Sequence, residues 1–220
     1  ILVILIDDAG YNDFGFMGSK EMQTPNIDAL TSEGVVFTDA HVAATVSSPS
    51  RACLITGRYG HRFGYECNLS DRTNGLPLEE ETIAEVFKTN GYRTAAIGKW
   101  HLGSRDEQHP NNRGFDLFYG MKAGGRDYFY NEKKSDRPGD ERNLLLNDRQ
   151  VKFEKYLTDA FSEKAVEFIN ESSQPFMMYL AYNAVHTPMQ ATDEDMAKFE
   201  GHPRQKLAAM TYALDRGVGT

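Results

Sequence analysis

The chain opens with Ile1-Leu2-Val3-Ile4-Leu5-Ile6, which runs directly into Asp7-Asp8. An uninterrupted apolar run of this length is typical of a strand buried on both faces, as in a parallel or mixed sheet. Two later segments, Arg93–Ile97 and Phe176–Tyr182, also have strand character, and helical patterns lie between the three. Strands that alternate with helices predict a layered α/β sheet.

Start and stop signals mark the helices between these strands. Thr24-Pro25 begins one that ends before Gly34, because Thr is a good N-cap and Pro suits the first helical position. Further helices are expected at these places: Ser48 to Gly57, Glu81 to Asn90, Thr158 onward and Lys206 to Val218. Their apolar stripes predict buried positions that include Leu30, Leu54 and Val86. Val35-Val36-Phe37 is expected to form a second short strand.

Composition excludes several classes of protein. The chain has 220 residues, and 24 Lys+Arg against 32 Asp+Glu give a net charge of −8, which argues against a dedicated DNA or RNA binder. No run of 18 apolar residues is present, so no membrane span is predicted. The cysteines, Cys53 and Cys67, could be bridged, free or buried, and they do not fix the redox compartment.

Four polar groups follow predicted strands or open a predicted helix. They are Asp7-Asp8, the pair Lys99 and His101, His186, and the segment Ser47–Arg51. In an open α/β sheet, ligands bind beyond the carboxyl ends of the strands. Segments far apart in the sequence therefore converge on one candidate site.

Each group has a chemical and a structural interpretation. Adjacent carboxylates at Asp7-Asp8 suit calcium or magnesium, which would need three or more ligands, but they also suit a solvated turn or a helix cap. In Ser47-Ser48-Pro49-Ser50-Arg51 a hydroxyl lies at a helix N-terminus beside a cation, although Ser and Pro are ordinary capping residues. Lys99 and His101 would face one anion, since side chains alternate along a strand.

His186 lies in a turn, where a single His is usually structural. The remaining histidines are interpreted as structural or solvated: His41, His61, His109 and His202.

Taken together, these segments resemble the type I sulfatase family of the alkaline-phosphatase-like superfamily. The most specific match is Ser47-Ser48-Pro49-Ser50-Arg51 followed by Thr56-Gly57-Arg58, which is similar to the family signature. Five further matches occur in the expected order: Ile4-Leu5-Ile6-Asp7-Asp8, Thr24–Phe37, Gly98-Lys99-Trp100-His101-Leu102-Gly103, Arg113-Gly114-Phe115-Asp116 and His186-Thr187-Pro188. The resemblance implies a mixed, largely parallel sheet sandwiched between helices.

The resemblance also implies a mechanism. Ser47 would be oxidised by a formylglycine-generating maturation enzyme to formylglycine, whose hydrate attacks the sulfur of a sulfate ester. Asp7, Asp8 and the hydroxyl derived from Ser47 would bind calcium, and Arg51 would hold the hydrate. Lys99 and His186 would bind sulfate oxygens, with His186 a candidate proton donor and His101 the base for sulfate release.

Two departures from the family pattern matter. The family supplies an Asp, an Asn and another Lys from a later strand, and no such segment precedes Thr220. Residues 1–220 are therefore expected to be the N-terminal part of the catalytic domain, with the rest of that domain and a smaller C-terminal domain beyond. Position 47 is Ser rather than the commoner Cys, which fits a bacterial Ser-type enzyme or a Cys-to-Ser change.

Alternative functions stay open from the sequence. A phosphatase, phosphotransferase or phosphonate ester hydrolase of the same superfamily, or an inactive anion-binding homologue, would keep much of the pattern. The polar segment 104–150 is expected to be long loops with one hairpin, and its Arg105 and Arg126 are candidates to bind a sulfated carbohydrate. A small-molecule or oligosaccharide sulfate ester is the expected substrate, and a bacterial periplasmic or secreted location is expected.

Overall fold

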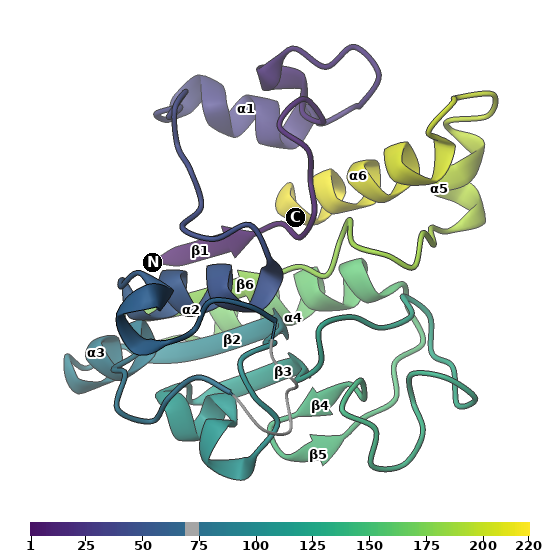
Figure 1. Cartoon of the computed structure of the whole chain (residues 1–220). Coiled ribbons are helices and arrows are strands. Elements are labelled where there is room, and N and C mark those ends of the chain that lie inside the picture. Colours follow the sequence, from purple (N-terminus) through teal and green to yellow (C-terminus); the bar gives the residue numbers. More distant parts are fainter. Residues whose placement is uncertain (69–74) are drawn as a thin grey trace.

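A mixed six-stranded sheet runs through the computed structural model, which describes residues 1–68 and 75–220 (Figure 1). The strands lie in the order β1 (Leu2–Leu5), β6 (Phe176–Ala181), β2 (Arg93–Lys99), β3 (Leu117–Met121), β4 (Leu145–Leu146) and β5 (Arg149–Gln150). Neighbours among the first four are parallel, and β4 and β5 are antiparallel. The prediction of a layered α/β fold with a largely parallel sheet is confirmed.

The central strand β6 explains why the sheet is covered on both faces. Met178 and Leu180 belong to one buried cluster, whereas Met177 and Tyr179 belong to the other. Side chains alternate between the faces of a strand, so a strand that is apolar throughout needs a layer of helices on each side. Tyr179 pairs with Val3 of β1 and Ala96 of β2, which places β6 between them.

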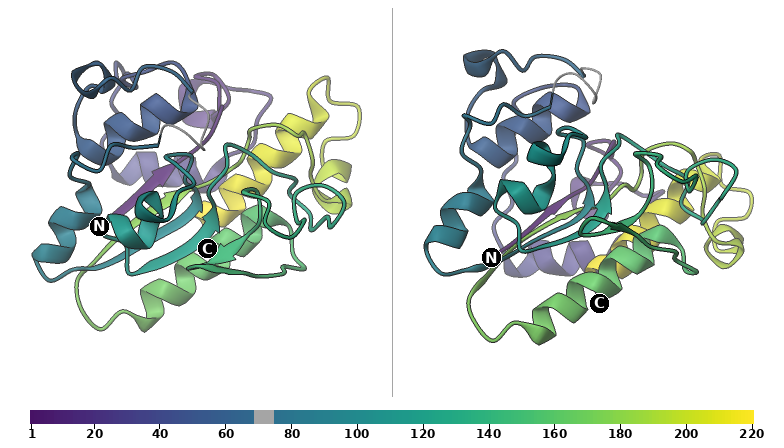
Figure 2. Two further views of the ribbon diagram at one scale, coloured as in Figure 1. Left: turned by 60° about the horizontal axis from the view of Figure 1, so that its bottom comes forward. Right: turned by 90° about the horizontal axis from the view of Figure 1, so that it is seen from below.

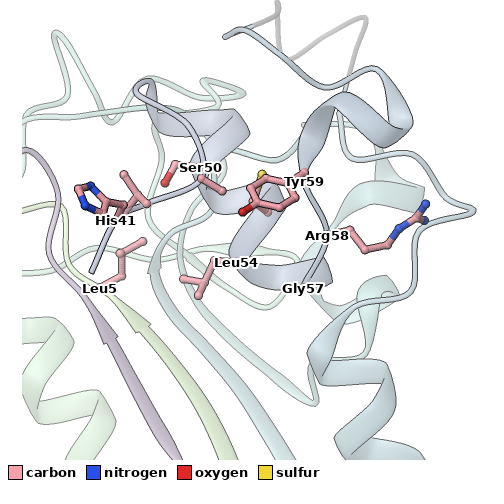
Figure 3. A pocket seen from close by; sticks show the side chains of 10 residues that line it. Leu5, His41, Ser50, Leu54, Gly57, Arg58 and Tyr59 are labelled. Carbon is pink, nitrogen blue, oxygen red and sulfur yellow. The ribbon is translucent and has the colours of Figure 1, made fainter. Parts of the chain in front are cut away.

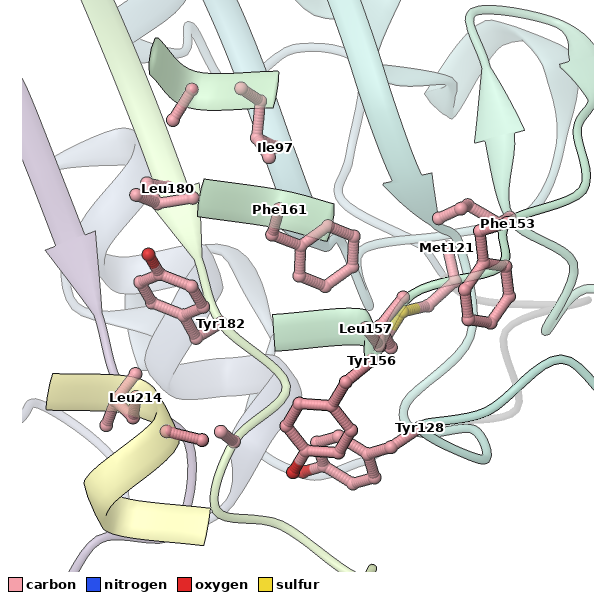
Figure 4. Close-up of a cluster of buried hydrophobic side chains, with 14 of the residues drawn as sticks. Ile97, Met121, Tyr128, Phe153, Tyr156, Leu157, Phe161, Leu180, Tyr182 and Leu214 are labelled. Atoms are coloured by element: carbon pink, nitrogen blue, oxygen red, sulfur yellow. The ribbon is translucent and has the colours of Figure 1, made fainter. Parts of the chain in front are cut away.

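Helices supply those two layers. The described helices are α1 (Pro25–Glu33), α2 (Ser47–Thr56), α3 (Ile83–Thr89), α4 (Leu157–Glu171), α5 (Asp193–Ala197) and α6 (Gln205–Val218), with short 3₁₀ helices at Gly15–Met17, Gly60–Phe63, Asp106–Gln108 and Pro110–Arg113. Phe161 of α4 and Leu214 of α6 pack with Leu180 on one face (Figure 4). Ala52 of α2 and Ala84 of α3 join the cluster on the other face, and Figure 2 shows α2 and α4 on opposite sides of the sheet.

Polar contacts fix how these helices begin. Thr82 accepts a hydrogen bond from Glu85 N at 3.1 Å, and Glu85 accepts one from Thr82 N at 2.7 Å, which forms a capping box at the start of α3. At α1 the cap comes from a distant helix. Asp215 of α6 accepts hydrogen bonds from the backbone of Asn26 and Ile27 at 3.1 and 2.8 Å, which ties α1 to α6.

Some sequence expectations about local structure are wrong. Val35-Val36-Phe37 is not a strand, and Val35 and Phe37 are 81% and 77% exposed. No described strand lies beside these residues to accept their backbone hydrogen bonds, and apolar character alone does not make a strand. Leu30, Leu54 and Val86 are predicted to be buried but are 56%, 42% and 42% exposed, because the apolar stripe of a helix does not specify which of its positions a neighbouring element covers.

The segment 104–150 is more ordered than expected. The predicted hairpin is present as β4 and β5, but β3 was not anticipated, since Tyr119 and Gly120 interrupt its apolar pattern. Among the described residues, no helix is both long and apolar enough to cross a membrane.

Candidate active site

Ser47 is the first residue of α2, and its hydroxyl faces the carboxyl end of the sheet. Its Oγ atom lies 3.1 Å from Arg51 Nε and 3.1 Å from His101 Nδ1. Arg51 is four residues later in the same helix, so it stands one turn above Ser47 on the same side. The N-terminus of α2 also favours negative charge at this position.

The two other serines of this motif, Ser48 and Ser50, do not face the polar site. The Ser48 hydroxyl is fully buried and lies 2.6 Å from Tyr65 Oη and 2.7 Å from the His101 carbonyl oxygen. Ser50 lines a cavity of about 470 Å³ together with Leu54 and Tyr59 (Figure 3). Neither Ser47 nor His101 is among the described residues that line this cavity. Of the three hydroxyls in the motif, Ser47 is therefore the one presented to the polar site.

Arg51 connects the start of α2 to the ends of two strands. Its guanidinium donates to the Lys99 carbonyl oxygen at 2.9 Å and to Asp7 Oδ1 at 2.9 Å, and the side chain is 1% exposed. Tyr179 Oη accepts a further hydrogen bond at 3.2 Å. A buried guanidinium requires this many partners, so its position is tightly defined.

Asp7 pairs with two cations. Its Oδ2 accepts a hydrogen bond from Lys99 Nζ at 2.6 Å, while Oδ1 accepts the one from Arg51. Burial opposes ionisation of Asp7, but the charges and hydrogen bonds of Arg51 and Lys99 outweigh it and lower the pKa of Asp7. Burial, together with the charge of Arg51, lowers the pKa of Lys99 to about 8. Two cations therefore face the single carboxylate of Asp7, while the Asp8 carboxylate also acts on Lys99.

His101 follows β2 with a left-handed backbone, at φ 57°. Burial, followed by the charges of Lys99 and Arg51, lowers the pKa of His101 to about 3, so the imidazole is neutral at pH 7. Arg51 Nε can only donate, so Ser47 Oγ accepts from it, and in the His101 tautomer that is protonated at Nε2 the Ser47 hydroxyl donates to Nδ1. The geometry places a neutral base beside the Ser47 hydroxyl.

His186 faces the same site from the segment after β6. Its Nδ1 lies 2.7 Å from the Thr187 carbonyl oxygen and therefore donates, while Nε2 lies 3.7 Å from Asp8 Oδ2. Tyr128 Oη donates toward the His186 carbonyl oxygen at 2.8 Å and holds this turn. Asp8 itself has a left-handed backbone, at φ 61°, and a side chain that is 63% exposed.

The structure thus brings together every residue expected at the catalytic centre: Asp7, Asp8, Ser47, Arg51, Lys99, His101 and His186.

Gly124 and Gly125 are site residues that sequence reasoning missed. A Cβ atom on Gly124 would lie 2.6 Å from His101 Nε2, and one on Gly125 would lie 3.2 Å from His186 Cε1. The backbone of Gly124 therefore leaves no room for a side chain beside His101, whereas at Gly125 a Cβ atom would fit only tightly beside His186. A glycine pair in a polar loop was the available signal, but it is equally typical of an ordinary turn.

The two arginines expected to bind substrate are placed differently. Arg126 is buried and makes a bidentate pair with Asp136 at 2.7 and 2.8 Å, and it also donates to the Arg142 carbonyl oxygen. Its donors are used inside the 104–150 segment, and a contact between Arg126 and substrate stays a prediction. Arg105 is half-exposed and pairs with Glu107 at 3.5 Å. In the described part of the chain, the hydrogen bond and ion pair of Arg105 are made with Gln108 and Glu107, within its own segment.

The residues supply only part of a calcium site. Asp7 and Asp8 provide hard carboxylate oxygens, and exposed Asp8 is open to a cation. Both oxygens of Asp7 already accept hydrogen bonds from cations, however. Across residues 1–68 and 75–220, no group of three or more His, Cys, Asp or Glu side chains could hold a metal ion. Calcium takes six to eight oxygen ligands, so these residues alone do not complete its shell.

Comparisons with known proteins agree with this geometry. The family model described as Sulfatase matches residues 1–216. Arylsulfatase G of Homo sapiens is 35% identical, covering 99% of this chain and 46% of that protein. N-acetylgalactosamine-6-sulfatase of Canis lupus familiaris is 32% identical, covering 100% of this chain and 45% of that protein. A crystal structure of Ps i-CgsB in complex with k-i-k-neocarrahexaose is 45% identical with a TM-score of 0.92, covering 99% of this chain and 52% of that one. The chain thus spans about half the length of these relatives.

Proposed function

The chain belongs to the type I sulfatase family, and we propose that it carries the catalytic centre of an enzyme that hydrolyses sulfate esters of carbohydrates. One observation carries this proposal. The Ser47 hydroxyl is held between a buried arginine and a neutral imidazole at a helix N-terminus, and the same arginine donates to the carbonyl oxygen of buried Lys99. This arrangement presents one activated oxygen to an anionic group.

Oxidation of Ser47 to formylglycine would supply a hydrated aldehyde whose hydroxyl attacks sulfur. The surrounding residues suit that group. Arg51 Nε already donates to the oxygen at position 47, and it would hold one hydroxyl of the hydrate in place. His101 Nδ1, 3.1 Å away, would accept a proton from the same position.

Sulfate binding is assigned to Lys99 and to the N-terminus of α2. Lys99 lies at the carboxyl end of β2 and carries three N–H donors, of which Asp7 uses one at 2.6 Å. In the proposal, the remaining Lys99 donors and the N-terminus of α2 bind the sulfate oxygens. Because the Lys99 side chain is 0% exposed, solvent screens its charge only weakly.

Proton delivery to the leaving alcohol is assigned to His186. Its Nδ1 proton is held by the Thr187 carbonyl oxygen, so Nε2 is the atom that gains or loses a proton. Asp8 Oδ2 stands 3.7 Å from Nε2, so this nitrogen lies on the side of the ring that faces the site.

Asp7 and Asp8 are proposed as two ligands of a divalent cation, with calcium the preferred ion for oxygen donors. Such a cation would lower the pKa of the hydroxyl at position 47 and stabilise charge on the sulfate. Calcium needs further ligands besides Asp7 and Asp8, so the metal is part of the proposal and not of the observed geometry.

A sulfated oligosaccharide is the proposed substrate class. The 45% identical structure was solved in complex with k-i-k-neocarrahexaose, and one relative is named N-acetylgalactosamine-6-sulfatase. Both names concern carbohydrates. A maturation enzyme that oxidises Ser47 is the partner that this function requires.

Sulfate release from a panel of sulfated oligosaccharides and an aryl sulfate tests the function. The matured full-length protein should release sulfate, and Ser47→Ala should abolish release while leaving the fold intact. Matched phosphate and phosphonate esters test the competing phosphoryl chemistry. Preferential hydrolysis of those esters, or activity that survives Ser47→Ala, would contradict the proposal.

A further inference from the structure

We propose that Ser48 and Tyr65 are positioning residues, which together hold the backbone of His101 so that its imidazole stays against Ser47. This inference rests on the proposed function, because it assigns the pair a role in the same reaction. Neither side chain touches the reacting atoms. Ser48 is 0% exposed and Tyr65 is 3% exposed, so both act from behind the site.

The direction of the hydrogen bonds follows from donor chemistry. The His101 carbonyl oxygen can only accept, so the Ser48 hydroxyl donates to it at 2.7 Å. The single hydroxyl proton of Ser48 is then used, and Tyr65 Oη must donate to Ser48 Oγ at 2.6 Å. The result is a directed chain that runs from the phenol through the serine to the carbonyl.

The backbone of His101 needs such support. Its φ of 57° lies in the left-handed region, which is disfavoured for residues with a Cβ atom. The His101 amide donates to the Lys122 carbonyl oxygen at 3.0 Å, so Ser48 and Lys122 hold both ends of the residue. Gly124 closes the space beside the ring. The conformation persists because these neighbours determine it together.

Ser48 couples this support to the nucleophile position. It follows Ser47 directly at the start of α2, and its own amide donates to Asn68 Oδ1 at 2.9 Å. The hydroxyl thus joins the first turn of α2 to the end of β2. This tie sets the separation of 3.1 Å between Ser47 Oγ and His101 Nδ1, on which proton transfer depends.

A matched pair elsewhere in the chain provides the control. Tyr182 Oη lies 2.7 Å from Ser162 Oγ, and Ser162 donates to the Thr158 carbonyl oxygen at 2.9 Å. Ser162 and Tyr182 are as buried as Ser48 and Tyr65. Substitution of either pair removes one serine hydroxyl and one tyrosine hydroxyl, but only Ser48 and Tyr65 hold His101.

The experiment compares Ser48→Ala and Tyr65→Phe with Ser162→Ala and Tyr182→Phe in the matured full-length protein, using an aryl sulfate. Displacement of His101 should lower kcat about tenfold in Ser48→Ala and Tyr65→Phe, with KM nearly unchanged. Ser162→Ala and Tyr182→Phe should change neither kcat nor KM. The ¹⁵N shifts of the His101 imidazole should move in Ser48→Ala and Tyr65→Phe only. Ser48→Thr, which keeps the hydroxyl, should restore kcat.

The outcomes separate this inference from the proposed function. Unchanged His101 shifts in both Ser48→Ala and Tyr65→Phe, or a loss of kcat no larger than in the control pair, would overturn the positioning role. A wild-type protein that releases no sulfate would instead contradict the proposed function, and the imidazole shifts would still decide the positioning role.

Discussion

Arg51 Nε lies 3.1 Å from the hydroxyl oxygen of Ser47, one turn earlier in α2, while the other end of the same guanidinium pairs with Asp7 at 2.9 Å. A single buried side chain therefore joins the nucleophile position to the carboxylate at the end of β1. The spacing of four residues produces this contact, because side chains four apart share one side of a helix.

Loss of activity at high pH is expected to follow Lys99. Its pKa is lowered to about 8, so the positive charge is present below that pH and is lost as pH rises through it. Sulfate release should decline over the same range. Lys99→Arg should move the decline upward, since a guanidinium stays protonated. Lys88→Arg, which changes an exposed lysine paired with Asp116, should leave the profile unchanged. A decline at the same pH in Lys99→Arg would refute this assignment.

A methyl group at Gly124 is expected to displace the base. The added Cβ would lie 2.6 Å from His101 Nε2, whereas at Gly125 it would lie 3.2 Å from His186 Cε1. Gly124→Ala should reduce kcat about a hundredfold, since a small misplacement of a catalytic group has that effect. Gly125→Ala should have a smaller effect. Steady-state kinetics on an aryl sulfate measure both, and the reverse order would contradict the packing argument.

Arg126 is expected to matter for stability and not for substrate binding. Breaking its buried pair with Asp136 by Arg126→Met should lower the free energy of unfolding by about 3 to 5 kcal/mol. Arg105→Ala, at a half-exposed side chain, should change it by less than about 0.5 kcal/mol. Urea denaturation measures both. A stable Arg126→Met protein with a raised KM would show that Arg126 binds substrate after all.

Removal of calcium is expected to abolish activity reversibly. Treatment with a chelator should stop sulfate release, and added calcium should restore it. Asp8→Asn should weaken calcium binding about tenfold or more by calorimetry, because a charged ligand is lost. Asp39→Asn is the matched control, since Asp39 is also exposed and paired with a histidine, His41. Equal calcium affinity in the Asp8 and Asp39 variants would remove Asp8 from the metal site.

The parts of the fold that sequence reasoning predicts well are those set by local signals. The apolar run before Asp7 and the Thr24-Pro25 helix start are both present where expected. Residues Val35–Phe37 are as apolar as the run before Asp7 but do not form a strand. A strand depends on pairing with a neighbouring strand, which the local sequence does not specify. The strand β3 was missed for the opposite reason, since pairing with β2 makes a strand of a weakly patterned segment.

The site divides in the same way. Residues at strand ends, such as Asp7 and Lys99, converge because parallel strands end at one edge of the sheet. Arg126 follows the Gly124-Gly125 pair, but its direction depends on Asp136, ten residues away, and the sequence does not show which way a loop side chain turns. The role of Gly124 depends on the absence of a side chain, which leaves no chemical signature in the sequence.

The most direct test of the central claim is the mass of the peptide that contains Ser47, in protein purified from its native host. The account predicts a peptide that lacks a pair of hydrogens relative to serine and reacts with a hydrazine probe, as an aldehyde does. An unmodified serine in a preparation that still hydrolyses sulfate esters would contradict it, because the nucleophile would then have to be a different group.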